Sequence, residues 1–459
     1  MYGVNVGFEI AKRAVLSTQY GINITGHNVA NVNTPGYTRQ AVDFKSTPPL
    51  RAGMFYAGSG VDVGDIRRIR WAFLDTQMQK EKQELGQWEN AEQIWSQVET
   101  IFNEPSDTGL SQALTDFWNA WSDLSDNPES SSAKTAVKES ANVVISNFHG
   151  ISSQLKDLRS SIDNDIQQTV TMINDYTRQV ANLNSRIVNA EVSGAKANDL
   201  RDRRDYIVEQ LAEFGNVRVR EDDSGAIDLF FGSAVLVTRG DYLELDTETV
   251  VEDGFLSSNI VLSSVSYNLD ISKGSLKSMM DARDTFIPDK LQKLDQLAAQ
   301  LVESVNELHS SGYTTDGTTG IDFFSADGVT ADSIGLSNEI LTDAENIVVS
   351  EDGSGGDNTV ALAIAELRNE KVMNDGTASL SGFYNSVISE IGSQAREASD
   401  MKTNHELMVN QLENRRQSIS GVSLDEEMAN LIAYENAYGA AAKVLDVMDS
   451  ALDTIVNKL

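Results

Sequence analysis

The chain has 459 residues, of which 40% are hydrophobic and 23% charged, as is ordinary for a folded protein with several cores. Its net charge of -33 argues against a nucleic-acid partner, because phosphate binding needs a basic face, and it also disfavours anionic membrane surfaces. The absence of cysteine excludes disulfides, thiol catalysis and cysteine-ligated metals. No apolar run approaches the ~18 residues of a membrane helix, and no cleaved secretion signal is visible, so cytoplasmic residence and export without a cleaved signal both stay open.

The apolar pattern predicts helices along most of the first half. Residues 4–31 form the first helix, which ends at Asn33–Gly36 because Pro35 disfavours helical geometry before it. Residues 37–66 are expected to be loops and short strands. Further helices are predicted over residues 73–102, 110–124, 133–192 and 198–214. The third of these would be about 90 Å long, which suits a rod better than a globular core.

The pattern changes at Gly215. From there to about residue 272, short runs of valine, isoleucine and phenylalanine alternate with Gly, Asp and Ser, which indicates a small β domain. Helix returns over residues 274–309, followed by loops and short strands to residue 357. Two more helices are predicted over residues 358–371 and 380–417. The last helix starts at Leu424, with Ser423 as its cap and Glu426 as the second member of a capping box.

This nested order predicts a mainly α protein with an inserted β domain. The terminal helices pair as a coiled coil, the body is a long helical bundle, and the β module lies outside it. The predicted boundaries are 1–66 with 404–459 for the terminal domain and its N-terminal loop and strand segment, 67–215 with 273–320 and 358–403 for the bundle, and 216–272 for the outer β domain, to which 321–357 could be added.

Both ends of the chain carry apolar heptads, the pattern of helices that pack along their length. The series are Phe8, Val15, Ile22 and Val29 near the N-terminus, and Leu424, Leu431, Tyr438, Leu445 and Leu452 near the C-terminus. Tyr434, Ala441 and Met448 follow three residues after members of the second series. The partner of the C-terminal helix is either the first segment of the same chain or its copy in a neighbouring subunit, and an assembly role is favoured over ordinary packing.

Residues suited to catalysis or metal binding are sparse. The four histidines, His27, His149, His309 and His405, are scattered and complete no zinc motif. Gly58–Gly64 has the wrong spacing for a dinucleotide loop and is interpreted as a turn before a strand. We therefore expect no enzyme activity and no cofactor.

The charged clusters are also interpreted as structural features and not as binding or catalytic sites. The acidic loops Asp222–Asp228 and Asp316–Asp322 lack the distal glutamate of a calcium loop and are interpreted as turns. Asp425, Glu426 and Glu427 suit the start of a helix through its dipole. The only dense basic run, Arg67, Arg68 and Arg70, is interpreted as a solvated face or as internal ion-pair partners.

One segment resembles a known family. Residues 26–40 read GHNVANVNTPGYTRQ, which is similar to the N-terminal signature of bacterial flagellar axial proteins, the rod, hook and hook-associated proteins. Three further stretches resemble the hook-associated members, namely Asn198–Asp205, His309–Tyr313 with Asp322–Ser325, and Ser418–Leu431. Trp71 stands where the family has an aspartate, which puts a local polar contact in doubt. The signature residues are Asn28, Asn31, Thr34, Pro35, Gly36, Tyr37, Arg39 and Gln40.

The resemblance implies a structural subunit at the junction between hook and filament. It implies self-association into a ring, contacts with the hook protein and a second hook–filament junction protein, a flagellar export chaperone, and an extracellular location reached without a cleaved signal peptide. The resemblance implies no cofactor and neither nucleic acid nor membrane as a partner. The alternatives are another axial protein of the hook or filament type and, from other classes, a secreted enzyme on a helical scaffold or an adhesin.

Overall fold

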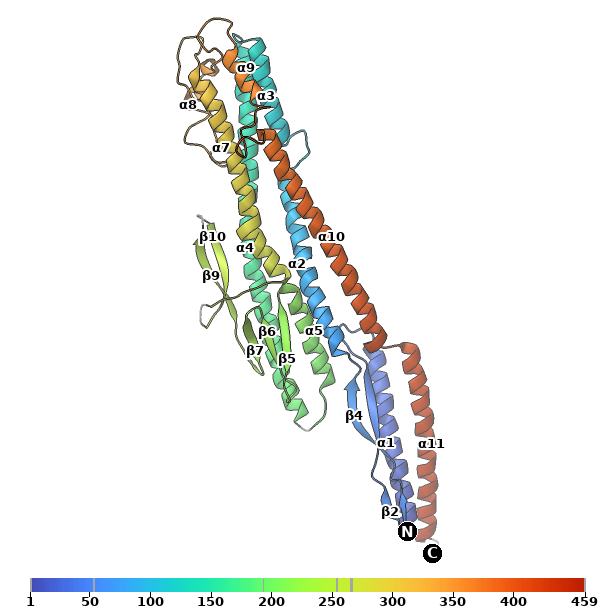
Figure 1. Ribbon diagram of the computed structural model, residues 1–459. Coiled ribbons are helices and arrows are strands. Elements are labelled where there is room, and N and C mark those ends of the chain that lie inside the picture. The colour runs from blue at the N-terminus through green and yellow to red at the C-terminus, as the bar shows by residue number, and fades with distance from the viewer. Residues whose placement is uncertain (1, 53, 193, 253–254, 265–266, 458–459) are drawn as a thin grey trace.

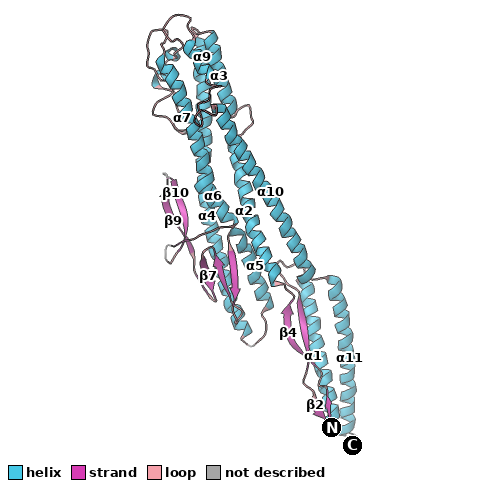
Figure 2. Ribbon diagram, viewed as in Figure 1, coloured by secondary structure: helices cyan, strands magenta, loops and turns pink. Residues whose placement is uncertain are grey.

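The computed structural model describes residues 2–52, 54–192, 194–252, 255–264 and 267–457. The molecule is a long helical rod with both chain ends at one tip and β strands along one side of its middle (Figures 1 and 2). The helices are α1 (Tyr2–Ala30), α2 (Ala72–Phe102), α3 (Leu110–Asp126), α4 (Ser131–Glu191), α5 (Asn198–Phe214), α6 (Gly274–Asp281), α7 (Ile287–Ser311), α8 (Asn338–Thr342), α9 (Thr359–Glu366), α10 (Leu380–Ser420) and α11 (Leu424–Asn457). The mainly α architecture with an inserted β module is confirmed.

The strands fall into four small antiparallel sheets. They are β1 (Gln40–Ser46) with β4 (Val61–Arg68), β2 (Leu50–Ala52) with β3 (Phe55–Ala57), the series β5 (Val217–Glu221), β6 (Ile227–Phe231), β7 (Ala234–Thr238) and β8 (Asp241–Tyr242), and the series β9 (Leu245–Glu252), β10 (Phe255–Leu262) and β11 (Tyr267–Asn268). The first two sheets lie beside α1, and the other two form the β module beside α4 and α5 (Figure 1).

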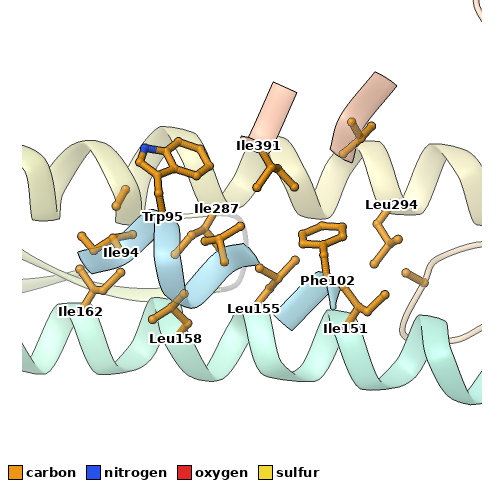
Figure 3. Close-up of a cluster of buried hydrophobic side chains, with 14 of the residues drawn as sticks. Ile94, Trp95, Phe102, Ile151, Leu155, Leu158, Ile162, Ile287, Leu294 and Ile391 are labelled. Atoms are coloured by element: carbon orange, nitrogen blue, oxygen red, sulfur yellow. The ribbon is translucent and has the colours of Figure 1, made fainter. Parts of the chain in front are cut away.

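The core of the body lies between α2, α4, α7 and α10. Apolar residues recur every three or four positions along each helix, so each buries one stripe. Figure 3 shows these stripes meeting, with Trp95 and Phe102 of α2 between α4 and α7. On α4, the Ser130 hydroxyl accepts from the Ala133 amide, a capping bond that satisfies one of the free donors at the helix start.

The helix predicted over residues 274–309 is interrupted. A π-helical turn, Ala282–Phe286, separates α6 from α7, and Pro288 lies in the first turn of α7. Proline has no amide hydrogen to donate to the carbonyl four residues earlier, so the bonding pattern widens here. The turn places Arg283, which is buried, beside Asp163 of α4 at 2.7 Å and the Ser258 carbonyl of β10 at 2.8 Å.

The β module is an insertion whose two ends meet. A Cβ atom added at Gly274, the first residue of α6, would lie 2.4 Å from the backbone of Phe214, the last residue of α5. Gly274 has φ of +83°, so this close approach and this backbone conformation both require glycine. The helical body therefore continues from α5 to α6 as if the module were absent.

Residues 321–357 lie at the tip farthest from the chain ends, with α3, α7 and α9, and not with the β module (Figure 1). Phe323 and Phe324 pack there against Phe117 and Trp121 of α3. The helix predicted over 358–371 is shorter, because the Asn369 amide bonds to the Glu366 carbonyl in a turn that closes α9. Within the described ranges, no helix combines the length and hydropathy needed to cross a bilayer.

Candidate assembly interface

The two terminal helices pair within one chain. Gly21 of α1 lies against the ring of Tyr434 on α11, and the side chain of Asn28 bonds to Glu427. The residue number thus rises along α1 while it falls along α11, so the helices are antiparallel. Of the two alternatives for the partner of the C-terminal helix, the structure has the first segment of the same chain.

Small and polar side chains occupy the centre of this helix pair. On α1 the buried positions include Ala11, Gly21 and Thr25, and on α11 they include Ala441. A Cβ at Gly21 would lie 2.9 Å from Tyr434, so glycine lets the two helices approach closely. The series Tyr434, Ala441 and Met448 faces α1 as predicted, since a Cβ at Gly7 would lie 2.8 Å from Met448 and Ala441 is buried. The other predicted heptad residues lie around this centre. Phe8, Val15, Ile22, Val29, Leu431, Leu445 and Leu452 are half-buried, whereas Leu424 and Tyr438 are exposed.

The helix pair leaves apolar surface open. Leu16 and Tyr20 of α1 are each about half exposed, and so are Leu424, Met428 and Ile432 of α11. The last three recur every four residues, so they share one side of the helix. An apolar stripe of this length next to half-buried heptad residues is typical of an interaction surface.

The signature residue Asn28 connects three segments of the chain. Its amide nitrogen donates to the Gln40 carbonyl at 2.9 Å and to Glu427 at 3.0 Å, and its oxygen accepts from the Tyr37 hydroxyl at 2.7 Å and the Gln40 amide at 3.0 Å. Asn28 is 1% exposed, and all four hydrogen-bonding positions of its amide group are used. Burial, followed by the nearby carboxylates Asp199, Asp202 and Glu427, raises the pKa of Tyr37 far above its ordinary value.

Arg39 holds the start of α11. Its Nε donates to the buried Glu427 at 2.7 Å, and its guanidinium also pairs with the exposed Glu426 at 3.1 Å. Its backbone amide donates to the carbonyl of Ser420, the last residue of α10. Ser423 caps α11 through the Glu426 amide as predicted, while the Glu426 carboxylate pairs with Arg39.

The other signature residues shape the turn after α1. Asn31 donates to the His27 carbonyl at 3.0 Å and accepts from the Thr34 hydroxyl at 3.1 Å, and Pro35 follows in the exposed turn. Gly36 has φ of +76°, and a Cβ there would lie 2.8 Å from the side chain of Tyr206 on α5. The turn therefore presses directly against α5 of the body.

One face of α5 receives the signature segment. Gln40 donates to Asp199 at 2.7 Å and accepts from Asn198 at 3.2 Å, and the Thr38 amide donates to Asp202 at 2.9 Å. The stretches Gly26–Gln40, Asn198–Asp205 and Ser418–Leu431, which are far apart in sequence, therefore meet in one place. We call this place, made of residues 31–40, 66–71, 198–206 and 420–423, the joint, and we call α1, β1–β4 and α11 the terminal module.

Two arginines of the basic run, Arg68 and Arg70, lie in the joint as internal ion-pair partners, whereas the exposed Arg67 pairs with Asp43 of β1 at 2.9 Å. Arg68 pairs with Asp202 at 2.8 Å and with Asp205 at 2.9 Å, and Arg70 pairs with Asp75 and Asp205. Burial alone would raise the pKa of Asp205, but the positive charges of Arg70, Arg204 and Arg68 lower it below its usual range. Burial raises the pKa of Asp202.

Trp71 occupies the position before α2 where the family has an aspartate. It makes no side-chain capping bond, and its exposed ring packs against Phe73. The local polar contact that an aspartate would make there is thus absent at Trp71.

The histidines are dispersed, as their spacing predicts. His27 contacts Asp199 at 3.2 Å, His149 contacts the Ile334 carbonyl at 2.8 Å and His405 contacts Glu81 at 2.9 Å. His309 is fully buried, and its ring bonds to the Ile321 carbonyl and accepts from the Val348 amide. The bond to Ile321 holds together His309–Tyr313 and Asp322–Ser325, the two stretches that resemble the family. In the part of the chain that the structure describes, no three His, Asp or Glu side chains are placed to hold a metal ion.

Both acidic loops contain turns, and in Asp316–Asp322 the Gly317 amide donates to the Thr314 carbonyl at 2.9 Å. The Asp222 carboxylate accepts from the Ser224 and Ala226 amides, which closes the loop before β6. Gly58–Gly64 likewise leads into strand β4, as interpreted from its spacing.

Two features of the site could not be predicted from the sequence. Glu427 is assigned by its sequence position to a helix dipole, yet it is the buried partner of Arg39 and Asn28. The docking face on α5 is marked only by its resemblance to the family and by the alternation of Asp and Arg in Asn198–Asp205. Charged residues three and four positions apart lie on the same side of a helix, and this spacing was the only signal in the sequence for a polar docking face on α5.

Comparisons with known proteins agree with this arrangement. Residues 95–324 match the family "Flagellar hook-associated protein FlgK helical domain", and residues 414–459 match "Flagellar basal body rod FlgEFG protein C-terminal". Flagellar hook-associated protein 1 of Bacillus subtilis is 31% identical, over 98% of each chain, and its counterpart in Salmonella typhimurium is 24% identical, over 96% of this chain and 97% of that one.

The fold agrees as well. The flagellar hook junction protein FlgK of Burkholderia pseudomallei superposes with a TM-score of 0.65 at 16% identity, over 75% of this chain and all of that one. With a relative 31% identical over almost its whole length, the chain belongs to the flagellar hook-associated protein 1 family.

Proposed function

We propose that this chain is a structural subunit of the junction between flagellar hook and filament, and that it assembles through the terminal helix pair. The observation that carries the proposal is the open apolar stripe of Leu424, Met428 and Ile432 beside the half-buried heptads. A second copy of the chain, with the same helix pair, offers a surface of the same chemistry. Self-association into a ring would cover both surfaces and release the water that they order.

The partners follow from this role and from the family. The hook protein would contact one side of the ring and a second hook–filament junction protein the other, and a flagellar export chaperone would hold the chain before assembly. The chain would act outside the cell, after export without a cleaved signal peptide. The family likeness supports these partners and this location.

A structural role is also supported over catalysis. The titratable groups of the joint are engaged with one another, since Arg68, Arg70, Asp202 and Asp205 form paired contacts. The histidines each contact a group from a distant segment. A general acid or base needs a free group within reach of a substrate.

The test is the substitution Leu445→Asp. Leu445 is half-buried on α11, and a carboxylate there would be desolvated in any apolar contact between helices. We expect the variant to be lost from hook–filament junctions while the body keeps its helical circular dichroism. Leu256→Asp is the matched control, because Leu256 is an exposed leucine of β10 remote from the terminal module. Normal incorporation of Leu445→Asp would contradict the proposal.

A further inference from the structure

We propose that the β module of one copy contacts the α4–α5 flank of the next copy, the side of these two helices that faces away from their own β module. The inference rests on the proposed function, because it assumes that copies of the chain lie side by side in a ring. It is carried by two pairs of exposed charges, the acidic pair Asp223 and Asp241 and the basic pair Arg186 and Arg203. The two pairs lie on opposite sides of one rod.

The basic pair lies on the α4–α5 flank. On α4, the buried Asn184 donates to the Arg239 carbonyl of the β module at 2.7 Å, and Arg186 lies about 200° further round the helix. On α5, the buried Arg204 donates to the Asn184 side chain at 3.4 Å, whereas the adjacent Arg203 is exposed. Because Asn184 and Arg204 meet, the two arginines that neighbour them lie at one level of the helix pair.

The acidic pair lies at the same level on the β module, which runs along one side of α4 (Figure 1). Gly240 packs directly against Ser185 of α4, and the exposed Asp241 comes next in the chain. Asp223 lies in the turn before β6, and an ion pair of 3.2 Å joins this turn to the one before β8. A copy displaced sideways therefore brings its acidic pair towards the basic pair of its neighbour.

These four charges have no ion-pair partner in their own chain. Other arginines of this part of the body do have one, namely Arg178 with Asp175, Arg201 with Glu191, Arg204 with Asp205, Arg220 with Asp228 and Arg239 with Asp222. Among the residues that the structure describes, neither arginine of the basic pair has such a partner, and neither aspartate of the acidic pair bonds to a basic side chain. All four are thus available to a partner outside the chain.

A second copy of this chain supplies the complementary charges. Residues 217–272, which form the β module, contain eleven acidic and three basic residues, so two β modules repel each other. The α4–α5 flank instead offers a β module two free arginines. A contact between two different surfaces of the same chain is heterologous, and its repetition about an axis closes into a ring.

The charges set which flanks meet and add little to the affinity. Exposed ion pairs contribute little to binding free energy, whereas like charges that are brought together oppose binding strongly. The affinity of the ring comes from the apolar stripe of the terminal helices, and the charged contact excludes the arrangement in which two β modules face each other.

Charge exchange tests the contact in flagellated cells that make only the variant chain. Arg186→Glu with Arg203→Glu places four negative charges at the contact, and Asp223→Lys with Asp241→Lys places four positive charges there. We expect each double variant to occur in hook–filament junctions at least about tenfold less often than the unchanged chain, counted by immunogold electron microscopy of isolated hooks. The fourfold variant restores opposite charges, so its incorporation should return to within about threefold of the unchanged chain.

Lys371→Glu with Arg396→Glu is the matched control for the first double variant. It changes the net charge by the same amount, at two exposed residues remote from both pairs, and its incorporation should be unchanged. Circular dichroism of each purified variant checks that the helical body is folded. Should a double variant not fold, the single reversals Arg203→Glu and Asp241→Lys, alone and together, take its place.

The other outcomes decide against the contact. Normal incorporation of both double variants would show that the two flanks do not meet. Failure of a folded fourfold variant would show that the two pairs do not face each other, and an equal loss in the control would show an effect of net charge alone. Absence of the unchanged chain from hook–filament junctions would instead contradict the proposed function itself.

Discussion

At the scale of single residues, the buried carboxylate of Glu427 connects the start of α11 to α1 and to the segment that follows it. It is 2% exposed and is held by Arg39 and Asn28, so it fixes where α11 lies along α1. A buried polar group of this kind can set the register of two helices, because any sliding leaves it unpaired. The adjacent Glu426, whose side chain is exposed, pairs with the same arginine.

The two neighbouring glutamates allow a matched test. Glu427→Gln removes the charge at nearly constant shape and leaves Arg39 without its buried partner, so we expect the terminal module to lose about 2–4 kcal/mol of stability. Glu426→Gln should cost less than about 1 kcal/mol, because exposed ion pairs contribute little. Hydrogen exchange over residues 2–30 and 424–457 measures both effects. Equal loss of protection in the two variants would contradict the assigned role of Glu427.

The buried His309 predicts a pH effect at the far tip of the rod. Burial lowers the pKa of His309 from its ordinary value of 6.5 to about 4, because the ring lies in an apolar aromatic cluster. Between these two values the unfolded chain binds a proton that the folded chain does not. The free energy of unfolding should therefore be fully retained above pH 6.5 and should fall as the pH drops towards 4, by roughly 3 kcal/mol in all.

Denaturant unfolding between pH 5 and pH 6.5, followed by tryptophan fluorescence, checks this effect. Trp121 lies 6.2 Å from the His309 ring between centroids, so its emission reports on the tip. His309→Gln should be less stable at pH 7, since it loses at least one buried hydrogen bond, but its stability should vary less with pH. A slope as steep as that of the unchanged chain would assign the pH effect to other groups.

At the scale of elements, glycine decides how closely the terminal helices approach. A Cβ at Gly21 would lie 2.9 Å from the Tyr434 ring, whereas nothing lies within 4 Å of a Cβ at Gly26 in the same helix. Gly21→Ala should therefore destabilise the terminal module by about 1–3 kcal/mol through overpacking. Gly26→Ala should stabilise it by about 0.5–1 kcal/mol, because alanine favours helix.

The test compares the stability of the terminal module in the two alanine variants. Thermal unfolding of the terminal module, read from hydrogen exchange in α11, should shift down for Gly21→Ala and up for Gly26→Ala. If both shift upward, helix propensity would outweigh the contact with Tyr434, and the close approach of α1 and α11 would carry no energetic weight.

Elements with strong periodicity were predictable from the sequence, and their ends less so. The stripe that runs from Val144 to Ile187 predicted α4, and a single period of 3.6 residues explains it. The break at Ala282–Phe286 was missed although Pro288 marks it, because a proline in the first turn of a helix is also ordinary. The short α9 was overextended, since a local turn at Asn369 ends it without glycine or proline.

The candidate interface was predictable in outline but not in its packing. Heptads indicate that two helices meet, and the apolar residues were expected at the centre of the contact. The structure places Tyr434 and Ala441 of the second predicted series there, against small residues of α1 such as Gly21, whereas Leu424 and Tyr438 of the first series are exposed. Which side of a helix faces its partner depends on contacts with distant residues, such as that of Gly21 with Tyr434, and these are not encoded by spacing alone.

At the scale of the whole molecule, the net charge of -33 opposes assembly. Copies that pack side by side through the terminal module bring many like charges together, and the apolar stripe of α11 must outweigh their repulsion. Salt shortens the range of that repulsion, from a Debye length of about 30 Å at 0.01 M to about 10 Å at 0.1 M. Hydrophobic contacts between helices are not weakened over this range.

We therefore expect self-association of the purified chain to strengthen as salt rises from 0.01 to 0.1 M. Light scattering at fixed protein concentration measures the change, and sucrose of equal osmolality is the control for effects other than screening. Ile432→Glu should abolish association at either salt concentration, because it places a charge in the apolar stripe that neighbouring copies are proposed to cover. Association that weakens with salt would instead indicate that ion pairs between copies, and not the apolar stripe, hold the assembly together.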